Sequence, residues 1–205
     1  VLVELGLPFW LAGSRGSQQG LKDALACGAQ GVQVGTAFAL CEESGLFAGY
    51  RRSMLEQLKR GEVDVYTDAL ASPTGFPFKV ARMAGTISEQ GVYEARERCC
   101  DLGYLRSPYR KEDGSLGYRC ASEPVEAFVK KGGELGETVG RKCLCNGLMA
   151  TMGLAQLQVG SILEKPIFTI GDDIKNLGPL IKKNLDFSAR DVIDFILGEG
   201  EPQLA

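Results

Sequence analysis

The sequence contains no histidine among its 205 residues. Imidazole is the most frequent general base in enzymes and a common metal ligand, so its absence excludes His-dependent triads and His-ligated metals within this segment. A catalytic histidine, if the chemistry needs one, is expected upstream of Val1. We therefore assign no catalytic residue here, and we expect the segment alone to be inactive.

Long apolar runs and an excess of basic charge are also missing. No apolar run is long enough to cross a bilayer, and no signal peptide is visible. The net charge of −3 and the pI near 5.2 argue against the basic face that nucleic acids require. We expect a cytoplasmic protein with no membrane or nucleic-acid partner, and leave open whether it forms a homo-oligomer.

The beginning of the chain suggests that sequence is missing before it. Residue 1 is valine rather than methionine, and it lies inside the apolar run Val-Leu-Val-Glu-Leu-Gly-Leu. We expect a piece of a longer protein.

Two successive units, each an apolar run followed by a small glycine-containing turn, come next. Residues 9–17 read Phe-Trp-Leu-Ala-Gly-Ser-Arg-Gly-Ser, and residues 28–36 read Gly-Ala-Gln-Gly-Val-Gln-Val-Gly-Thr. We expect a strand over 8–12 that is buried on both faces, with Trp10 in the core, and a second strand over 31–34. A helix capped by Ser17 is expected between them.

This arrangement is typical of the phosphate site of a (βα)8 barrel, which the loops after the last two strands build from backbone amides. Ordinary tight turns are the alternative interpretation. The predicted fold is α/β: the C-terminal part of a (βα)8 TIM barrel, meaning its last two strand–helix units, followed by a loop-rich, cysteine-containing α-helical tail. The predicted domains are residues 1–70, the end of the barrel, and residues 71–205, a tail that packs on the barrel.

Several further elements can be predicted from the local patterns. A charged amphipathic helix is expected over 48–60, ending at Gly61, and a strand over 63–67. Residues 99–147 show little periodicity and need more than a simple core to hold them. An apolar helix is expected over 148–157, and Ser188 is expected to cap a last helix.

The segments Phe9–Ser17 and Ala24–Glu43 resemble the C-terminal third of the nitronate monooxygenases, formerly called 2-nitropropane dioxygenases. The second loop of that family is matched in full by residues 33–36, whereas its first loop, usually Gly-Gly-Ile, reads Gly-Ser-Arg here. The resemblance continues through Ser72–Lys79, Cys100–Leu105, Gly117–Cys120 and Arg141–Gly147. By this resemblance, contacts to an FMN phosphate fall on Gly13, Ser14, Gly35 and Thr36, with Gln33 and Val34 lining the same strand end.

The resemblance implies an FMN-dependent oxidation of an alkyl nitronate by dioxygen, which gives a carbonyl compound and nitrite. The flavin would carry this chemistry while the protein binds and orients it. Two alternatives stay open. One is a flavin- and NAD(P)H-dependent enoyl-acyl-carrier-protein reductase, and the other is a non-enzymatic interaction module held together by zinc.

Seven cysteines are present, five of them between residues 99 and 145. Cys27 and Cys41 lie in apolar surroundings and are expected in the core. Zinc held by Cys100, Cys120, Cys143 and Cys145 is one interpretation of the others, and reduced, packed thiols are the second. Because no Cys-x-x-Cys pair is present, we assign no metal ligand from the sequence.

Overall fold

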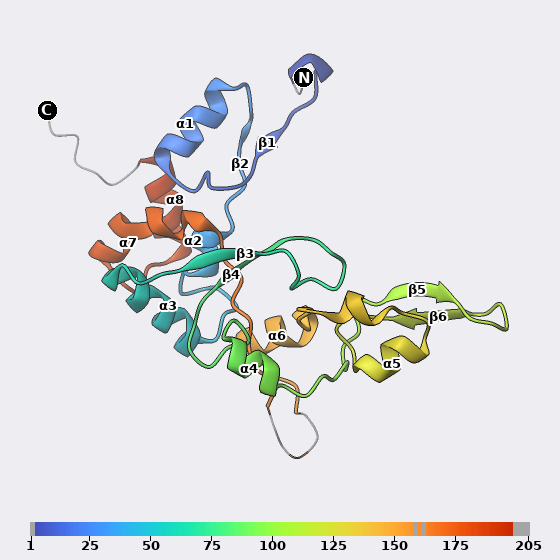
Figure 1. Ribbon diagram of the computed structural model, residues 1–205. Helices are drawn as coiled ribbons and strands as arrows, with labels where there is room; N and C mark the ends of the chain where they lie inside the picture. Colours follow the sequence, from blue (N-terminus) through green and yellow to red (C-terminus); the bar gives the residue numbers. More distant parts are fainter. Residues whose placement is uncertain (1–2, 158–159, 161–162, 199–205) are drawn as a thin grey trace, which may run out of the picture. The chain divides into compact units, whose positions relative to one another are not determined.

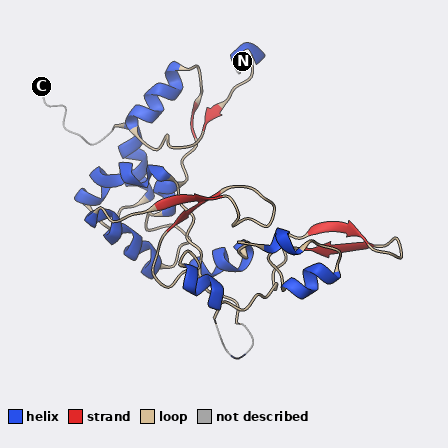
Figure 2. Cartoon of the chain, viewed as in Figure 1, coloured by secondary structure: helices blue, strands red, loops and turns tan. Residues whose placement is uncertain are grey.

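The structure is a computed structural model that describes residues 3–157, 160 and 163–198. Helices and strands are mixed along the chain (Figures 1 and 2), as predicted. Contacts divide the chain into unit 1, drawn from residues 1–63 and 170–205, and unit 2, residues 64–169. The strands of the described residues form three separate two-stranded sheets and no closed barrel. The barrel origin of the first strands and the division at residue 70 stay predictions.

Unit 1 contains one two-stranded sheet and helices from both of its chain segments. Its elements are η1 (Val3–Leu5), β1 (Trp10–Leu11), α1 (Gln18–Ala26), β2 (Gly31–Val32), α2 (Thr36–Ala39), α3 (Ala48–Arg60), η4 (Asp172–Leu177), α7 (Gly178–Lys183) and α8 (Ala189–Leu197). No helix of the described residues is long and apolar enough to span a membrane.

Unit 2 contains the other two sheets. Its elements are β3 (Val65–Asp68), β4 (Phe78–Ala81), α4 (Gln90–Ala95), β5 (Ser107–Arg110), β6 (Leu116–Arg119), α5 (Val125–Lys130), η2 (Leu135–Thr138) and α6 (Leu144–Thr151). β5 and β6 form an antiparallel hairpin within the stretch that shows little sequence periodicity.

β1 and β2 of unit 1 pair in parallel, with Trp10 opposite Gly31. Helix α1 connects them and begins where the sequence indicates, because the Ser17 Oγ accepts the Gly20 N–H at 3.0 Å. The helix ends before Gly28, whose φ of 83° is a left-handed conformation that favours glycine. The predicted strand–helix–strand order is therefore confirmed.

The prediction that the first strand is buried on both faces is wrong. Trp10 is 53% exposed, and its indole lies against Gly31, where a Cβ atom would sit 3.1 Å from the indole Cδ1. The sheet has only two strands among the described residues, so no third strand covers this ring. Cys27, also expected in the core, is exposed, whereas Cys41 is buried as predicted.

The helix ends of unit 1 follow their local signals. Helix α3 stops at Gly61, which has a φ of 72°. Helix α8 begins with a capping box, in which the Ser188 Oγ accepts the Asp191 N–H and the Asp191 carboxylate accepts the Ser188 N–H. Both boundaries are confirmed.

Replacing Ser188 by alanine should lower the free energy of unfolding by about 1 kcal/mol, because the first turn of α8 loses an acceptor for its free N–H groups. Urea unfolding followed by circular dichroism measures this. The matched control is Ser53→Ala in the middle of α3, where no cap is removed, and it should cost no more than about 0.5 kcal/mol. An equal loss in both variants would contradict the role of the cap.

The core of unit 2 forms where β4 meets α6. Its fully buried members are Val80, Ile87, Leu144 and Ile167. The segment before residue 170 is fixed by backbone hydrogen bonds: the Ile167 N–H donates to the Gly147 carbonyl at 3.1 Å, and the Ile87 N–H donates to the Pro166 carbonyl at 2.9 Å. Close packing sets this path, since a Cβ on Gly147 would lie 2.8 Å from the Ile167 Cγ2.

The helix predicted over 148–157 is wrong in its bounds, because α6 covers Leu144–Thr151. Gly153 ends it with a φ of 79°, and the Leu154 N–H reaches back to the Met149 carbonyl at 2.9 Å. This is a Schellman motif, which closes the last turn although the sequence beyond it is still apolar.

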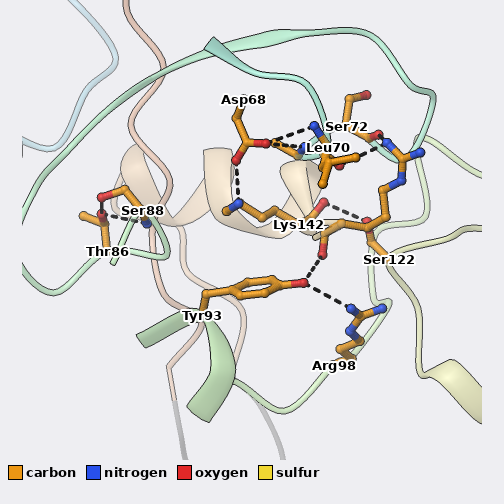
Figure 3. A network of polar contacts seen from close by, with 11 residues as sticks. Asp68, Leu70, Ser72, Thr86, Ser88, Tyr93, Arg98, Ser122 and Lys142 are labelled. Atoms are coloured by element: carbon orange, nitrogen blue, oxygen red, sulfur yellow. Dashed lines mark hydrogen bonds and ion pairs between the residues drawn. The ribbon is translucent and has the colours of Figure 1, made fainter. Parts of the chain in front are cut away.

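A buried polar network holds together the loops of unit 2 (Figure 3). The Lys142 Nζ lies 2.6 Å from the Asp68 Oδ2 and 4.9 Å from the centre of the Tyr93 ring. The Ser122 Oγ donates to the Lys142 carbonyl at 2.7 Å, and the Arg98 Nη2 donates to the Tyr93 hydroxyl at 3.2 Å. Burial alone would raise the pKa of the Asp68 carboxyl, but the Lys142 hydrogen bond and charge lower it overall.

Candidate functional site

The two loops that the sequence identifies leave the same edge of the β1–β2 pair. Because the strands are parallel, their carboxyl ends lie together, and the residues that follow both strands meet there. The Gln33 N–H donates to the Leu11 carbonyl at 2.9 Å, which extends the pairing to the start of the loops. The structure thus brings all six predicted residues to one edge: Gly13, Ser14, Gln33, Val34, Gly35 and Thr36.

The first loop has an unusual backbone. Gly13 has a φ of 79°, and Ser14, with a φ of 56°, is the one non-glycine residue of the described chain with a positive φ. The first loop therefore makes a tight turn that a glycine followed by a small residue can adopt. Gly16 lets the second loop approach, because a Cβ there would lie 3.0 Å from the Val34 Cγ1.

The second loop leaves open space where a ligand could lie. Gly35 is exposed and has ordinary backbone angles, and nothing lies within 4 Å of a Cβ atom built on it. The same holds for the space at Gly13. The amides of Gly13, Ser14 and Gly35 donate to no backbone carbonyl among the described residues. Three exposed backbone donors at one edge suit an anion such as a phosphate group.

Thr36 is in a different situation from the other five residues. It is buried as the first residue of α2, its Oγ1 donates to the Asp173 Oδ1 at 2.5 Å, and it accepts the Gly171 N–H at 3.3 Å. The hydroxyl is therefore already engaged. A phosphate could use it only by displacing the Asp173 carboxylate, which would otherwise repel the phosphate.

Asp173 is the neighbour of the site that sequence reasoning missed. It lies 137 positions after Thr36 in the sequence, and it does not follow a strand as the other residues of the site do. Two adjacent aspartates after a glycine are typical of a solvated loop. The contact of Asp173 with Thr36 becomes visible only in the structure, where η4 packs against α2. Arg15 adds one cation to the first loop, with its Nη1 3.8 Å from the Asp23 carboxylate.

Comparison with known proteins gives two partial matches. A nitronate monooxygenase of Paraburkholderia phytofirmans is 44% identical over 57 residues, which is 28% of this chain and 16% of that protein. A probable nitronate monooxygenase of Bacillus subtilis is 42% identical over 52 residues, 25% of this chain and 15% of that protein. No family model and no solved structure matches the chain.

These names suggest an oxidoreductase. The matched segments span about a sixth of the length of the two curated relatives and about a quarter of this chain.

Three cysteines of unit 2, namely Cys99, Cys120 and Cys143, are poor nucleophiles. Burial raises the pKa of the Cys143 thiol to about 12, despite an opposing hydrogen bond from the Asn146 N–H. Burial also raises the pKa of Cys120, and burial with the neighbouring Asp101 carboxylate raises that of Cys99 to about 11. Such thiols stay protonated at neutral pH, where a nucleophilic cysteine needs a lowered pKa.

Proposed function

We propose that this chain forms the phosphate-binding part of an FMN-dependent oxidoreductase that oxidises alkyl nitronates with dioxygen. The observation that carries the proposal is the meeting of the Gly13–Gly16 and Gln33–Thr36 loops at the carboxyl edge of a parallel strand pair. The names of the two partial relatives support the same reaction class. The products would be a carbonyl compound and nitrite.

The residues present fit the phosphate end of the cofactor. The exposed amides of Gly13, Ser14 and Gly35 would donate to phosphate oxygens, and the open space at both glycines admits the group without a steric clash. Gln33 and Val34 would line the strand end beside it. FMN, when bound, supplies the redox chemistry. The part assigned to this chain is to bind and orient, and no proton transfer is assigned to it.

Oxygen uptake tests the reaction directly. The protein is purified at its full natural length with FMN, and an alkyl nitronate is added without any nicotinamide cofactor. We expect oxygen consumption together with nitrite formation. Bleaching of the flavin by NAD(P)H, with no response to the nitronate, would overturn the proposal in favour of a nicotinamide-dependent flavin reductase and leave the phosphate loops in place.

Replacing Gly35 by glutamate should weaken FMN binding by about tenfold or more, because a carboxylate would face the phosphate in space that is now open. The fold should persist, since Gly35 has a φ of −106° that other residues adopt readily. The quenching of flavin fluorescence during titration measures the affinity.

The matched control is Gly136→Glu in η2 of unit 2, where a Cβ also meets nothing within 4 Å. It adds the same charge outside the two loops and should leave the affinity unchanged. Equal FMN affinity in the Gly35 variant and the wild type would contradict the assignment of this loop.

A further inference from the structure

The hairpin of unit 2 and helix α5 form a polar hollow. Helix α5 lies beside the hairpin of β5 and β6 (Figure 1), since the guanidinium carbon of Arg119 in β6 stands 5.4 Å from the centre of the Phe128 ring in α5. The hollow has a volume of about 730 Å³, which lies within the range of small-molecule sites. Its lining includes no residue of the two loops assigned to FMN.

Cations predominate in the lining of this hollow, although the whole chain has a net charge of −3. The cationic side chains are those of Arg110, Lys111, Arg119, Lys130 and Lys131, and the carboxylates are those of Glu112 and Asp113. The Lys131 Nζ lies 2.8 Å from the Glu123 Oε2, which neutralises it. The remaining four cations and two carboxylates give the hollow a formal charge of +2. Concave surfaces of one charge focus the electric field, so this hollow should attract anions.

Arg119 is the fixed cation of the hollow. Its guanidinium carbon lies 5.2 Å from the centre of the Tyr109 ring and 5.4 Å from that of the Phe128 ring, and its Nη1 donates to the Lys131 carbonyl at 2.7 Å. The positive charge thus faces two rings and a carbonyl dipole rather than a carboxylate. A guanidinium has five N–H donors in a planar fork that matches phosphate oxygens. The donors that the carbonyl does not use can bind an anion, and the side chain is already ordered.

Two glycines keep these aromatic rings in position. A Cβ atom on Gly117 would lie 2.6 Å from the Tyr109 Cε1, and one on Gly133 would clash with the Phe128 ring. Only a residue without a side chain therefore fits against each ring. Because the rings in turn contact Arg119, the fold itself positions the cation.

Lys111 and Lys130 add exposed amines to the lining. Lys111 follows Tyr109 by two positions, and its N–H donates to the Ser115 carbonyl at 2.9 Å, so the hairpin continues and both side chains leave the same face. Lys130 is the last residue of α5. The Asp113 Oδ1 accepts the Ser115 N–H at 2.9 Å and the Ser115 Oγ at 2.6 Å. One of the two carboxylates is therefore engaged within the turn.

We propose that this hollow binds a small organic molecule that carries a phosphate group. The phosphate would lie against Arg119, with Lys111 and Lys130 turned toward it, and the rest of the molecule would lie beside Tyr109 and Val129. A phosphate monoester has a charge of about −1.5 to −2 at neutral pH, which matches the formal charge of the lining.

The size of the hollow and the charge of the chain favour this ligand over other phosphates. A volume of about 730 Å³ is much larger than a phosphate ion needs, so an ion alone would leave most of the hollow to water. A nucleic acid would need a broad basic face, whereas the chain is acidic, with a pI near 5.2. An organic phosphate uses both the cations and the remaining volume.

Phenyl phosphate is the probe that tests this site in the full-length protein. The protein is first saturated with FMN, which occupies the loops of unit 1, and phenyl phosphate is then titrated by calorimetry at low ionic strength in a buffer free of phosphate. We expect saturable binding of about one molecule per chain, weakened by added salt. Inorganic phosphate should bind about threefold or more weakly, because it lacks the apolar part. No saturable binding of phenyl phosphate, or equal binding of inorganic phosphate, would overturn the proposal.

Reversing the charge of one lysine locates the site. Lys111→Glu should weaken the binding of phenyl phosphate by about tenfold or more, because a carboxylate in the hollow would repel the phosphate. The fold should persist, since the side chain is exposed. The matched control is Lys182→Glu, an exposed position of α7 outside the hollow, and it should leave the affinity unchanged. An equal loss in both variants would show a general effect of net charge and would overturn the assignment.

A second pair of variants separates this site from the proposed FMN loops. Gly35→Glu should leave the binding of phenyl phosphate unchanged, and Lys111→Glu should leave the FMN affinity unchanged, because the two residues belong to different units. Binding of phenyl phosphate that is lost in the Gly35 variant and retained in the Lys111 variant would assign it to unit 1 and overturn this proposal. Neither result depends on the proposed oxidoreductase reaction.

Discussion

Replacing Glu164 by glutamine should lower the free energy of unfolding of unit 2 by about 3–5 kcal/mol. The Glu164 carboxylate accepts from the Arg96 Nε at 2.6 Å and from the Arg96 Nη2 at 2.7 Å, and the two side chains are 1% and 7% exposed. Burial alone would lower the pKa of the Arg96 guanidinium, but the hydrogen bonds and charge of Glu164 raise it. Removing the carboxylate leaves that cation buried without its counter-charge.

The control for this variant is an ion pair at the surface. Arg52 and Glu56, one turn apart in α3, lie 3.3 Å apart with exposures of 57% and 46%. Glu56→Gln should change the free energy of unfolding by about 0.5 kcal/mol or less, because water screens the pair. Urea unfolding, with hydrogen exchange to separate residues 64–169 from unit 1, measures both. A Glu164 variant as stable as the Glu56 variant would show that the buried pair is not needed.

The sequence predicts well those boundaries that local chemistry decides. Ser17 and Ser188 act as caps, and Gly28 and Gly61 end helices, because each depends on one side chain or one φ angle. The bounds of α6 differ from the predicted 148–157 because an apolar run, rather than a cap or a glycine, was the basis of that prediction. Its apolar run continues to Leu157, but the Schellman turn at Gly153 stops it, and an apolar pattern by itself does not show where a turn closes.

The burial of individual side chains was less predictable. Trp10 and Cys27 have apolar surroundings in sequence, yet both are exposed, because burial depends on which elements lie across from them. Cys41 shows the opposite outcome with a similar local sequence. Whether such a side chain is buried depends on residues distant in sequence, and local patterns contain no information about them.

In the candidate site too, the features that depend on local sequence could be predicted and those that depend on distant contacts could not. Gly13, Ser14 and Gly35 could be found from sequence because a glycine turn after each of two strands has a known geometric consequence. The engagement of Thr36 by Asp173 could not, since it depends on the return of the chain 137 positions later.

Replacing Gly20 by alanine should disturb the first phosphate loop although the residue lies in α1. A Cβ there would stand 2.7 Å from the Arg15 carbonyl oxygen and 2.9 Å from its Cα and carbonyl carbon. These are backbone atoms, so the clash cannot be relieved by a side-chain rotation, and the loop of residues 13–16 has to move. We expect a loss of about 1–3 kcal/mol in the free energy of unfolding.

The same displacement should weaken FMN binding by about tenfold or more, since the amides of Gly13 and Ser14 would no longer share an edge with Gly35. The matched control is Gly178→Ala in the first turn of α7, where a Cβ meets nothing within 4 Å, and both stability and affinity should stay at wild-type values. A Gly20 variant that is destabilised but binds FMN as tightly as the wild type would separate loop packing from phosphate binding. The amides of the first loop would then not be the donors, and the second loop alone would have to hold the phosphate.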